Sequence, residues 1–264
     1  MQASQALNSG ALFPVSWGGG VQHNGYYQVP KDVIFFIFSF CLAELPMLAS
    51  LSKQWKGVTR EYGEKILRPI AFGKKQYEEY IGTVPEEPPI PLAAVEYVVK
   101  DPTGYLLTLI PKTINGHPVT MNYIEILVAH PLKGNPTGFY FLYDPIRKEY
   151  GNIPNETSHW VLSKIKLVGC GQNEETQEDL AKEEKLAWPE LLDTIVSVFM
   201  QSISKETFVF SNSTYTLLKQ MIEGSLISVG NYSASGLFVG KLHYCNTDIG
   251  VAGARKSNDL SHKA

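Results

Sequence analysis

The segment Val29–Trp55 reads VPKDVIFFIFSFCLAELPMLASLSKQW, and it decides how the N-terminal part of the chain is interpreted. Pro30 suits the first position of a helix, where its missing N–H costs nothing, and Asp32 suits the first turn, where the helix dipole favours a carboxylate. The residues that follow are apolar on nearly every side of such a helix. A helix without a water-facing side needs neighbours on more than one side.

A second apolar stripe follows Pro46 at spacings of three or four residues, which predicts an amphipathic helix. Its members are Leu48, Leu51, Trp55, Val58, Tyr62 and Ile66. Some forty residues are too few to cover the first helix on all sides, because small domains bury little of their surface. The uncovered side of the first helix is therefore expected to meet the rest of the chain, another protein or a membrane.

A membrane anchor is one interpretation of the stretch from Val33 to Leu51, which is nearly long enough to span a bilayer. Two residues argue against it. Glu44 would place a carboxylate near the middle of the span, at a cost of several kcal/mol, and Pro46 would break the helix. A membrane span is therefore the weaker alternative, and we expect a cytoplasmic protein.

The order of these residues resembles the F-box. Val29-Pro30 stands where that family has Leu-Pro, Ile37-Phe38 matches its Ile-Phe pair, and Ser52-Lys53-x-Trp55 matches its closing motif. The first Leu is replaced here by Val. The resemblance covers about forty residues, and the ordered set is more specific than any one of its members.

The resemblance implies a three-helix module that docks on a Skp-family subunit of a cullin-RING ubiquitin ligase, while a second domain selects the protein to be ubiquitinated. The residues that it assigns to partner binding are shared with the module's own core, and the sequence does not divide them. They are Val29, Pro30, Val33, Ile37, Phe38, Leu48, Leu51 and Trp55.

Composition bounds the class of protein. The chain has 264 residues, of which 44% are hydrophobic and 19% charged, so it can bury a core. The formal net charge of -3 argues against a nucleic-acid-binding surface, which is normally basic. The three cysteines form no disulfide framework, which suits a reducing compartment. The first residues lack the basic and apolar regions of a secretory signal peptide.

Changes of pattern along the chain predict three parts. Residues 1–27 are expected to form a flexible leader, residues 28–68 the F-box-like helical module, and residues 69–264 an α+β domain that binds the target. The stretch GTVPEEPPIPL (82–92) predicts either an extended, solvated linker or a rigid loop laid over the second domain.

Short apolar runs bounded by Gly and Pro predict strands in the second domain, and apolar residues at helical spacing predict helices. Buried strands are expected at 104–111 and 138–145 and a further strand at 158–169, with a short helix at 120–130. A helical region spans 174–204, with a new helix beginning at Pro189, and two strands surround a turn at 231–236. The predicted fold class is α+β.

Parts of residues 70–256 also resemble uncharacterised proteins of chlamydia-like intracellular bacteria. The stretches that carry this likeness are LTLIPKTINGHPVTMN, EYGNIPNETSHWVLSKIKLVG and ISVGNYSASGLFV. A bacterium has no cullin ligase of its own. The likeness therefore implies an effector that is delivered into the host cytosol and recruits the host's ligase.

A thiol hydrolase acting on ubiquitin-like substrates is the enzymatic alternative. Cys170 lies between two glycines, and a thiolate nucleophile needs a histidine beside it. The candidate bases are His117, His130, His159 and His243, but no motif surrounds the cysteine. No histidine pair has the spacing of a metal site. We therefore expect no catalytic residue, no metal and no cofactor.

Overall fold

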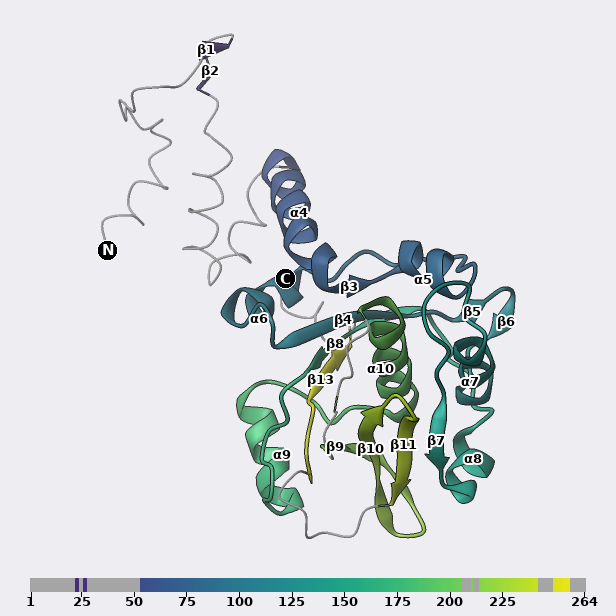
Figure 1. Ribbon diagram of the computed structural model, residues 1–264. Helices are drawn as coiled ribbons and strands as arrows, with labels where there is room; N and C mark the ends of the chain where they lie inside the picture. The colour runs from purple at the N-terminus through teal and green to yellow at the C-terminus, as the bar shows by residue number, and fades with distance from the viewer. Residues whose placement is uncertain are drawn as a thin grey trace. The chain divides into compact units, whose positions relative to one another are not determined.

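The computed structural model describes residues 22–23, 26–27, 53–205, 210, 214–241 and 249–256 (Figure 1). The chain divides into two compact units, Met1–Leu45 and Pro46–Ala264. In the first unit the described residues are β1 (Gln22–His23) and β2 (Tyr26–Tyr27), which pair antiparallel. The second unit is a mixed α+β structure, as the sequence predicted. The boundary between the units falls inside the expected 28–68 module.

The first sheet of the second unit has four strands in the order β13-β8-β4-β3. They are β13 (Ala254–Lys256), β8 (His159–Lys164), β4 (Tyr105–Ile110) and β3 (Ala71–Phe72). β8 pairs antiparallel with both of its neighbours, and β3 runs parallel to β4. Every residue of β4 is buried, which explains why this strand is a nearly continuous apolar run whose only hydroxyls are those of Tyr105 and Thr108.

The second sheet has five strands in the order β12-β9-β10-β11-β7. They are β12 (Ile249–Gly250), β9 (Tyr215–Ile222), β10 (Ser225–Ser233), β11 (Gly236–Lys241) and β7 (Phe139–Leu142). β9, β10 and β11 form an antiparallel meander, while β12 and β7 join its two edges in parallel. Both outer strands are thus brought in from distant parts of the chain.

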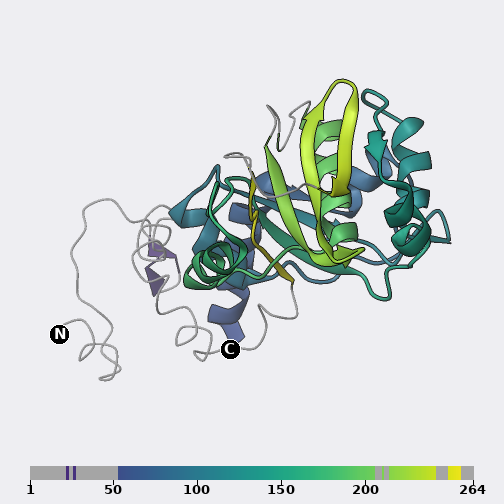
Figure 2. The ribbon, with the colours of Figure 1, turned by 90° about the horizontal axis from the view of Figure 1, so that it is seen from below.

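The central element is α10 (Leu191–Lys205), which packs against β4 and β8 of the first sheet and against β9 and β10 of the second (Figures 1 and 2). Its side chains from Leu191 to Ser204 are buried or half-buried. A helix covered on two sides by sheets needs apolar residues beyond one stripe, and α10 supplies them in Ile195, Val196 and Phe199.

The remaining helices lie around this core. They are α4 (Lys53–Leu67), η2 (Arg68–Ile70), α5 (Lys74–Tyr80), η3 (Leu92–Ala94), α6 (Val95–Lys100), α7 (Met121–Ala129), α8 (Asp144–Tyr150) and α9 (Glu174–Glu183). Thr120 is the N-cap of α7, and its hydroxyl accepts a hydrogen bond from Tyr123 N. Asn173 is the N-cap of α9, and its side-chain oxygen accepts a hydrogen bond from Thr176 N. α7 and α8 pack together beside β7.

Most of the elements predicted for the second domain are confirmed. The strands at 104–111 and 158–169, the helix at 120–130 and the two helices within 174–204 all form. The run 138–145 forms β7, but its predicted burial is wrong: Tyr140 and Phe141 are each 43% exposed, since β7 lies at the edge of its sheet among the described strands. The predicted turn at 231–236 is shorter, because β10 continues to Ser233 and Ser233 pairs with Gly236.

The proline-rich stretch 82–92 is a loop laid over the domain, and its interpretation as a solvated linker is wrong. Val84 and Ile90 are buried, and the indole N–H of Trp160 donates to Pro88 O at 2.8 Å. The loop is also joined to the hairpin of β5 (Thr113–Ile114) and β6 (His117–Pro118), because Thr83 N donates to Asn115 Oδ1 and Asn115 N donates to Thr83 O.

Candidate functional site

The residues predicted to bind a Skp-family subunit are mostly beyond the part of the chain that the structure describes. Seven of them lie outside the described residues: Val29, Pro30, Val33, Ile37, Phe38, Leu48 and Leu51. Trp55 lies in the first turn of α4, at a position where only the backbone is described.

The last two turns of α4 pack against other elements of the second unit. It packs against η3 and α6, and the contact is close at Gly63, where an added Cβ would lie 2.5 Å from Leu92 Cδ2. Leu67 is completely buried. Arg60, Glu64 and Arg68 form ion pairs at i,i+4 spacing on the exposed side. The end of the predicted module is thus an amphipathic helix with its apolar side on the domain.

Exposed apolar side chains gather in residues 121–153, which we call the 121–153 region. Among the described residues, five of the seven large hydrophobic side chains that are exposed belong to it: Ile126, Leu132, Tyr140, Phe141 and Ile153. They come from α7, β7 and the segments that follow α7 and α8, which lie side by side in both views (Figures 1 and 2). Exposed apolar residues gathered in one part of a fold are typical of protein interfaces.

The 121–153 region is held rigidly. Phe141 stacks on Phe238 of β11 with ring centroids 5.0 Å apart, and Tyr140 Oη accepts a hydrogen bond from Asn231. Arg147 of α8 makes a two-pronged ion pair with Glu125 of α7, which raises the pKa of the guanidinium. Fixed side chains lose little conformational freedom when a partner covers them, which favours binding.

A buried group of charges connects α10 to the first sheet. Asp193 Oδ1 lies 3.2 Å from His159 Nε2, and Asp193 Oδ2 lies 3.2 Å from Lys256 Nζ. Lys256 also reaches Glu190 Oε2 at 3.0 Å. His159 begins β8, Asp193 lies in the first turn of α10, and Lys256 ends β13, so the carboxylate ties three elements together.

The contacts of His159 favour its protonated form. Its Nδ1 lies 2.9 Å from Thr157 O and its Nε2 faces Asp193, and both partners are acceptors. A neutral imidazole has only one N–H, so both contacts are satisfied only by the imidazolium. Burial lowers the pKa of His159, but the hydrogen bond and charge of Asp193 outweigh it, so the pKa of His159 is raised. Burial likewise opposes the raised pKa of Lys256, which Asp193 and Glu190 sustain.

This arrangement is suited to stability and not to acid–base catalysis. Both nitrogens of His159 are occupied, and the side chain is 6% exposed, so no substrate proton can reach it. The pairing with Asp193 was missed, because residues 34 positions apart meet only in the tertiary structure.

Cys170 is exposed and lies in a tight turn between Gly169 and Gly171, both at positive φ. The described histidines are engaged elsewhere: His159 with Asp193, and His117 with the ring of Tyr123, while His130 ends α7. His243 lies outside the described residues. The thiol-hydrolase alternative stays a prediction.

No described helix is long and apolar enough to cross a membrane, and the stretch from Val33 to Leu51 lies outside the described residues. Within the same residues, no three His, Cys, Asp or Glu side chains are grouped so that they could hold a metal ion.

Comparison with models of protein families, with curated proteins and with solved structures found no match for this chain.

Proposed function

We propose that this protein is an F-box-type adaptor, which docks on a Skp-family subunit of a cullin-RING ubiquitin ligase and recruits a target protein through its C-terminal domain. The observation that carries the proposal is the ordered pattern from Val29-Pro30 through Ile37-Phe38 to Ser52-Lys53-x-Trp55. An apolar helix with no water-facing side is costly unless a partner covers it.

The packing of α4 supports a protein with one part for ligase binding and another for target binding. α4 contains Trp55, the last residue of the F-box-like pattern. Its last turns pack on η3 and α6 at Gly63, and Leu67 is buried. The end of the proposed ligase-binding module is therefore packed on the proposed target-binding domain.

The 121–153 region is the proposed target-binding surface. Two of its exposed apolar side chains, Tyr140 and Phe141, are held by contacts within the fold, and two of its charged side chains are paired within the chain, Arg147 with Glu125 and Lys133 with Glu79. A neutral, apolar surface fits a protein partner that offers apolar side chains of its own. In the effector setting, this partner is a host protein and the protein acts in the host cytosol.

Binding of the purified chain to a purified Skp-family subunit tests the proposal directly. Isothermal titration calorimetry should detect a complex for the unmodified protein, and the double variant Pro30→Ala, Ile37→Ala should abolish it. Circular dichroism should show that this variant keeps the fold of the second domain.

The matched control is Ile126→Ala, which changes an apolar residue of the 121–153 region. It should leave binding to the Skp-family subunit unchanged. Absence of binding by the unmodified protein, or equal binding by the Pro30/Ile37 variant, would refute the adaptor function.

A further inference from the structure

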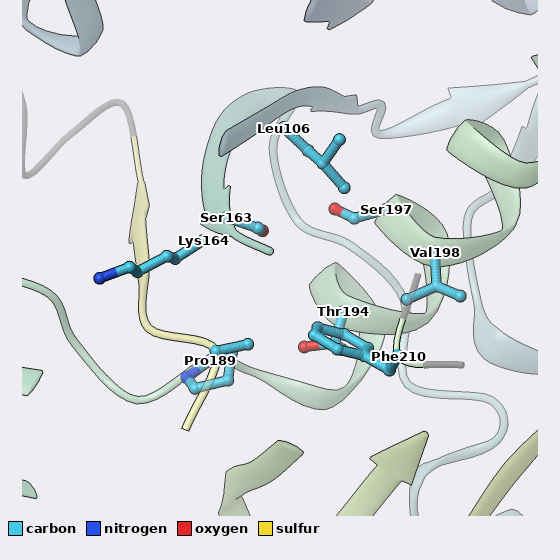
Figure 3. A pocket seen from close by; sticks show the side chains of 9 residues that line it. Leu106, Ser163, Lys164, Pro189, Thr194, Ser197, Val198 and Phe210 are labelled. Carbon is cyan, nitrogen blue, oxygen red and sulfur yellow. The ribbon is translucent and has the colours of Figure 1, made fainter. Parts of the chain in front are cut away.

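A small cavity lies where α10 crosses the first sheet (Figure 3). Its volume of about 10 Å³ is close to the smallest that holds one water molecule. Its walls are apolar on several sides, with Leu106 of β4, Val198 of α10 and Phe210 among the residues that line it. The cavity is therefore too small for a metabolite and admits a ligand of the size of water.

The cavity contains a buried hydroxyl without a protein partner. Ser197 is 2% exposed, and within the described residues its Oγ makes no hydrogen bond. In Figure 3 the hydroxyls of Ser163, on β8, and Ser197, on α10, point toward each other across the cavity. A buried hydroxyl is costly unless it is hydrogen-bonded, so the site requires a further polar group between the two serines.

The ligand that fits is neutral. Lys164 lines the cavity, but its ammonium group points away from it and pairs with Glu184 on the outside. Thr194 donates its hydroxyl proton to Glu190 O and keeps its lone pairs for a donor. Two serine hydroxyls and the Thr194 oxygen supply both donors and acceptors, which a water molecule can satisfy at once.

We infer that this cavity binds one structural water molecule, which bridges Ser163 Oγ of the first sheet and Ser197 Oγ of α10. The water would attach the middle of α10 to β8, as Asp193 attaches its first turn. The site is independent of the proposed function.

Gln201, one turn further along α10, provides the contrast. It is 1% exposed, and both its amide nitrogen and its amide oxygen lack hydrogen-bond partners within the described residues. Unlike Ser197, it is not among the residues that line the cavity. Replacing an unpaired buried polar group by an apolar one of similar shape is neutral or stabilising, so Gln201→Met should not weaken the fold.

A double-substitution cycle with Ser163→Ala and Ser197→Ala tests the inference. Each single change should raise the unfolding equilibrium constant, and the second should raise it by a smaller factor once the first has removed the water. The expected coupling is about twofold or more in that constant. Gln201→Met measured in parallel should show no loss.

A crystal structure of the unmodified chain should show water density within hydrogen-bond distance of both hydroxyls. Two results would overturn the inference: no density at this place, or a stabilising Ser197→Ala whose effect adds to that of Ser163→Ala.

Discussion

Two regions reverse the usual distribution of side chains: the side of α10 that faces the first sheet, and the 121–153 region. The buried helix places Asp193, Ser197 and Gln201 against the sheet, whereas the surface region exposes Ile126, Leu132 and Phe141. Folding alone would favour the opposite arrangement, because burial of apolar area stabilises and burial of charge costs. In both regions the placement of side chains therefore departs from the one that would bury the most apolar area.

The difference lies in what each region has for partners. Asp193 is compensated by His159 and Lys256, so its burial is tolerated only while both are present. The exposed side chains of the 121–153 region need no such compensation, because leaving a partly exposed apolar group in water costs little. Removing a buried partner should thus change stability greatly, whereas removing an exposed apolar group should change mainly binding.

The largest effect is expected from Asp193→Ala. It leaves the buried cation of His159 without its counterion and takes one of two carboxylates from Lys256, which should lower the free energy of unfolding by about 3–5 kcal/mol. Urea denaturation measures this loss. Glu190→Ala is the matched control, because Glu190 is 38% exposed in its pair with Lys256 and should cost no more than about 1 kcal/mol. Similar losses for both variants would contradict the role given to Asp193.

Two isoleucines of α7 allow the stability contributions of a core position and a surface position to be compared on one helix. Ile124 is fully buried and Ile126 is 61% exposed. Ile124→Ala should cost about 2–5 kcal/mol through lost burial and a cavity, whereas Ile126→Ala should stay within about 0.5 kcal/mol of the unmodified protein. Thermal unfolding of both variants tests this, and a large loss from Ile126→Ala would show that the surface is part of the core.

A smaller, pH-dependent effect follows from His159. Its pKa in the folded chain is raised above the ordinary value of 6.5, so its contribution is complete below that value and is lost as the pH rises through the folded pKa. The free energy of unfolding should therefore fall on passing from about pH 6 to more alkaline buffers. In His159→Gln this slope should be weaker, and an unchanged slope would exclude His159 as its source.

The smallest effect on stability is expected from Ile126→Ser combined with Leu132→Ser. The unfolding free energy should change by less than about 1 kcal/mol in total, since both side chains are exposed. If the 121–153 region binds the target, ubiquitination of that target by a reconstituted ligase should drop sharply. Val99→Ser, an exposed position on α6, should leave it unchanged. Equal activity of all variants would move the target site elsewhere.

Local patterns predicted much of the second domain. α10 was expected from Leu191, Ile195 and Phe199 at helical spacing after Pro189, and β4 from an apolar run between Gly and Pro. β9 was not predicted, and its pairing with β10 explains why the tail forms a three-stranded meander. The hairpin at Asn115–Gly116 was also missed, although this dipeptide with two positive φ angles is a strong turn signal.

Some candidate sites were likewise predictable from the sequence, and others were not. The F-box-like pattern is a matter of residue order and was visible in the sequence, as was the thiol of Cys170. The buried charges and the cavity were not, since His159, Asp193 and Lys256 come from separate elements and show no local motif. The exposure of Tyr140 and Phe141 was misjudged, because an edge strand and a central strand have the same composition here.

The sequence by itself determined the α+β class and most helices and strands after residue 100. These follow from periodicity and turn chemistry, which act over a few residues. Only the tertiary structure decided that the 82–92 stretch lies on the domain, that Asp193 meets two cations, and that the 121–153 region keeps apolar side chains in solvent. Burial and charge pairing depend on which distant elements become neighbours, and no local pattern contains that information.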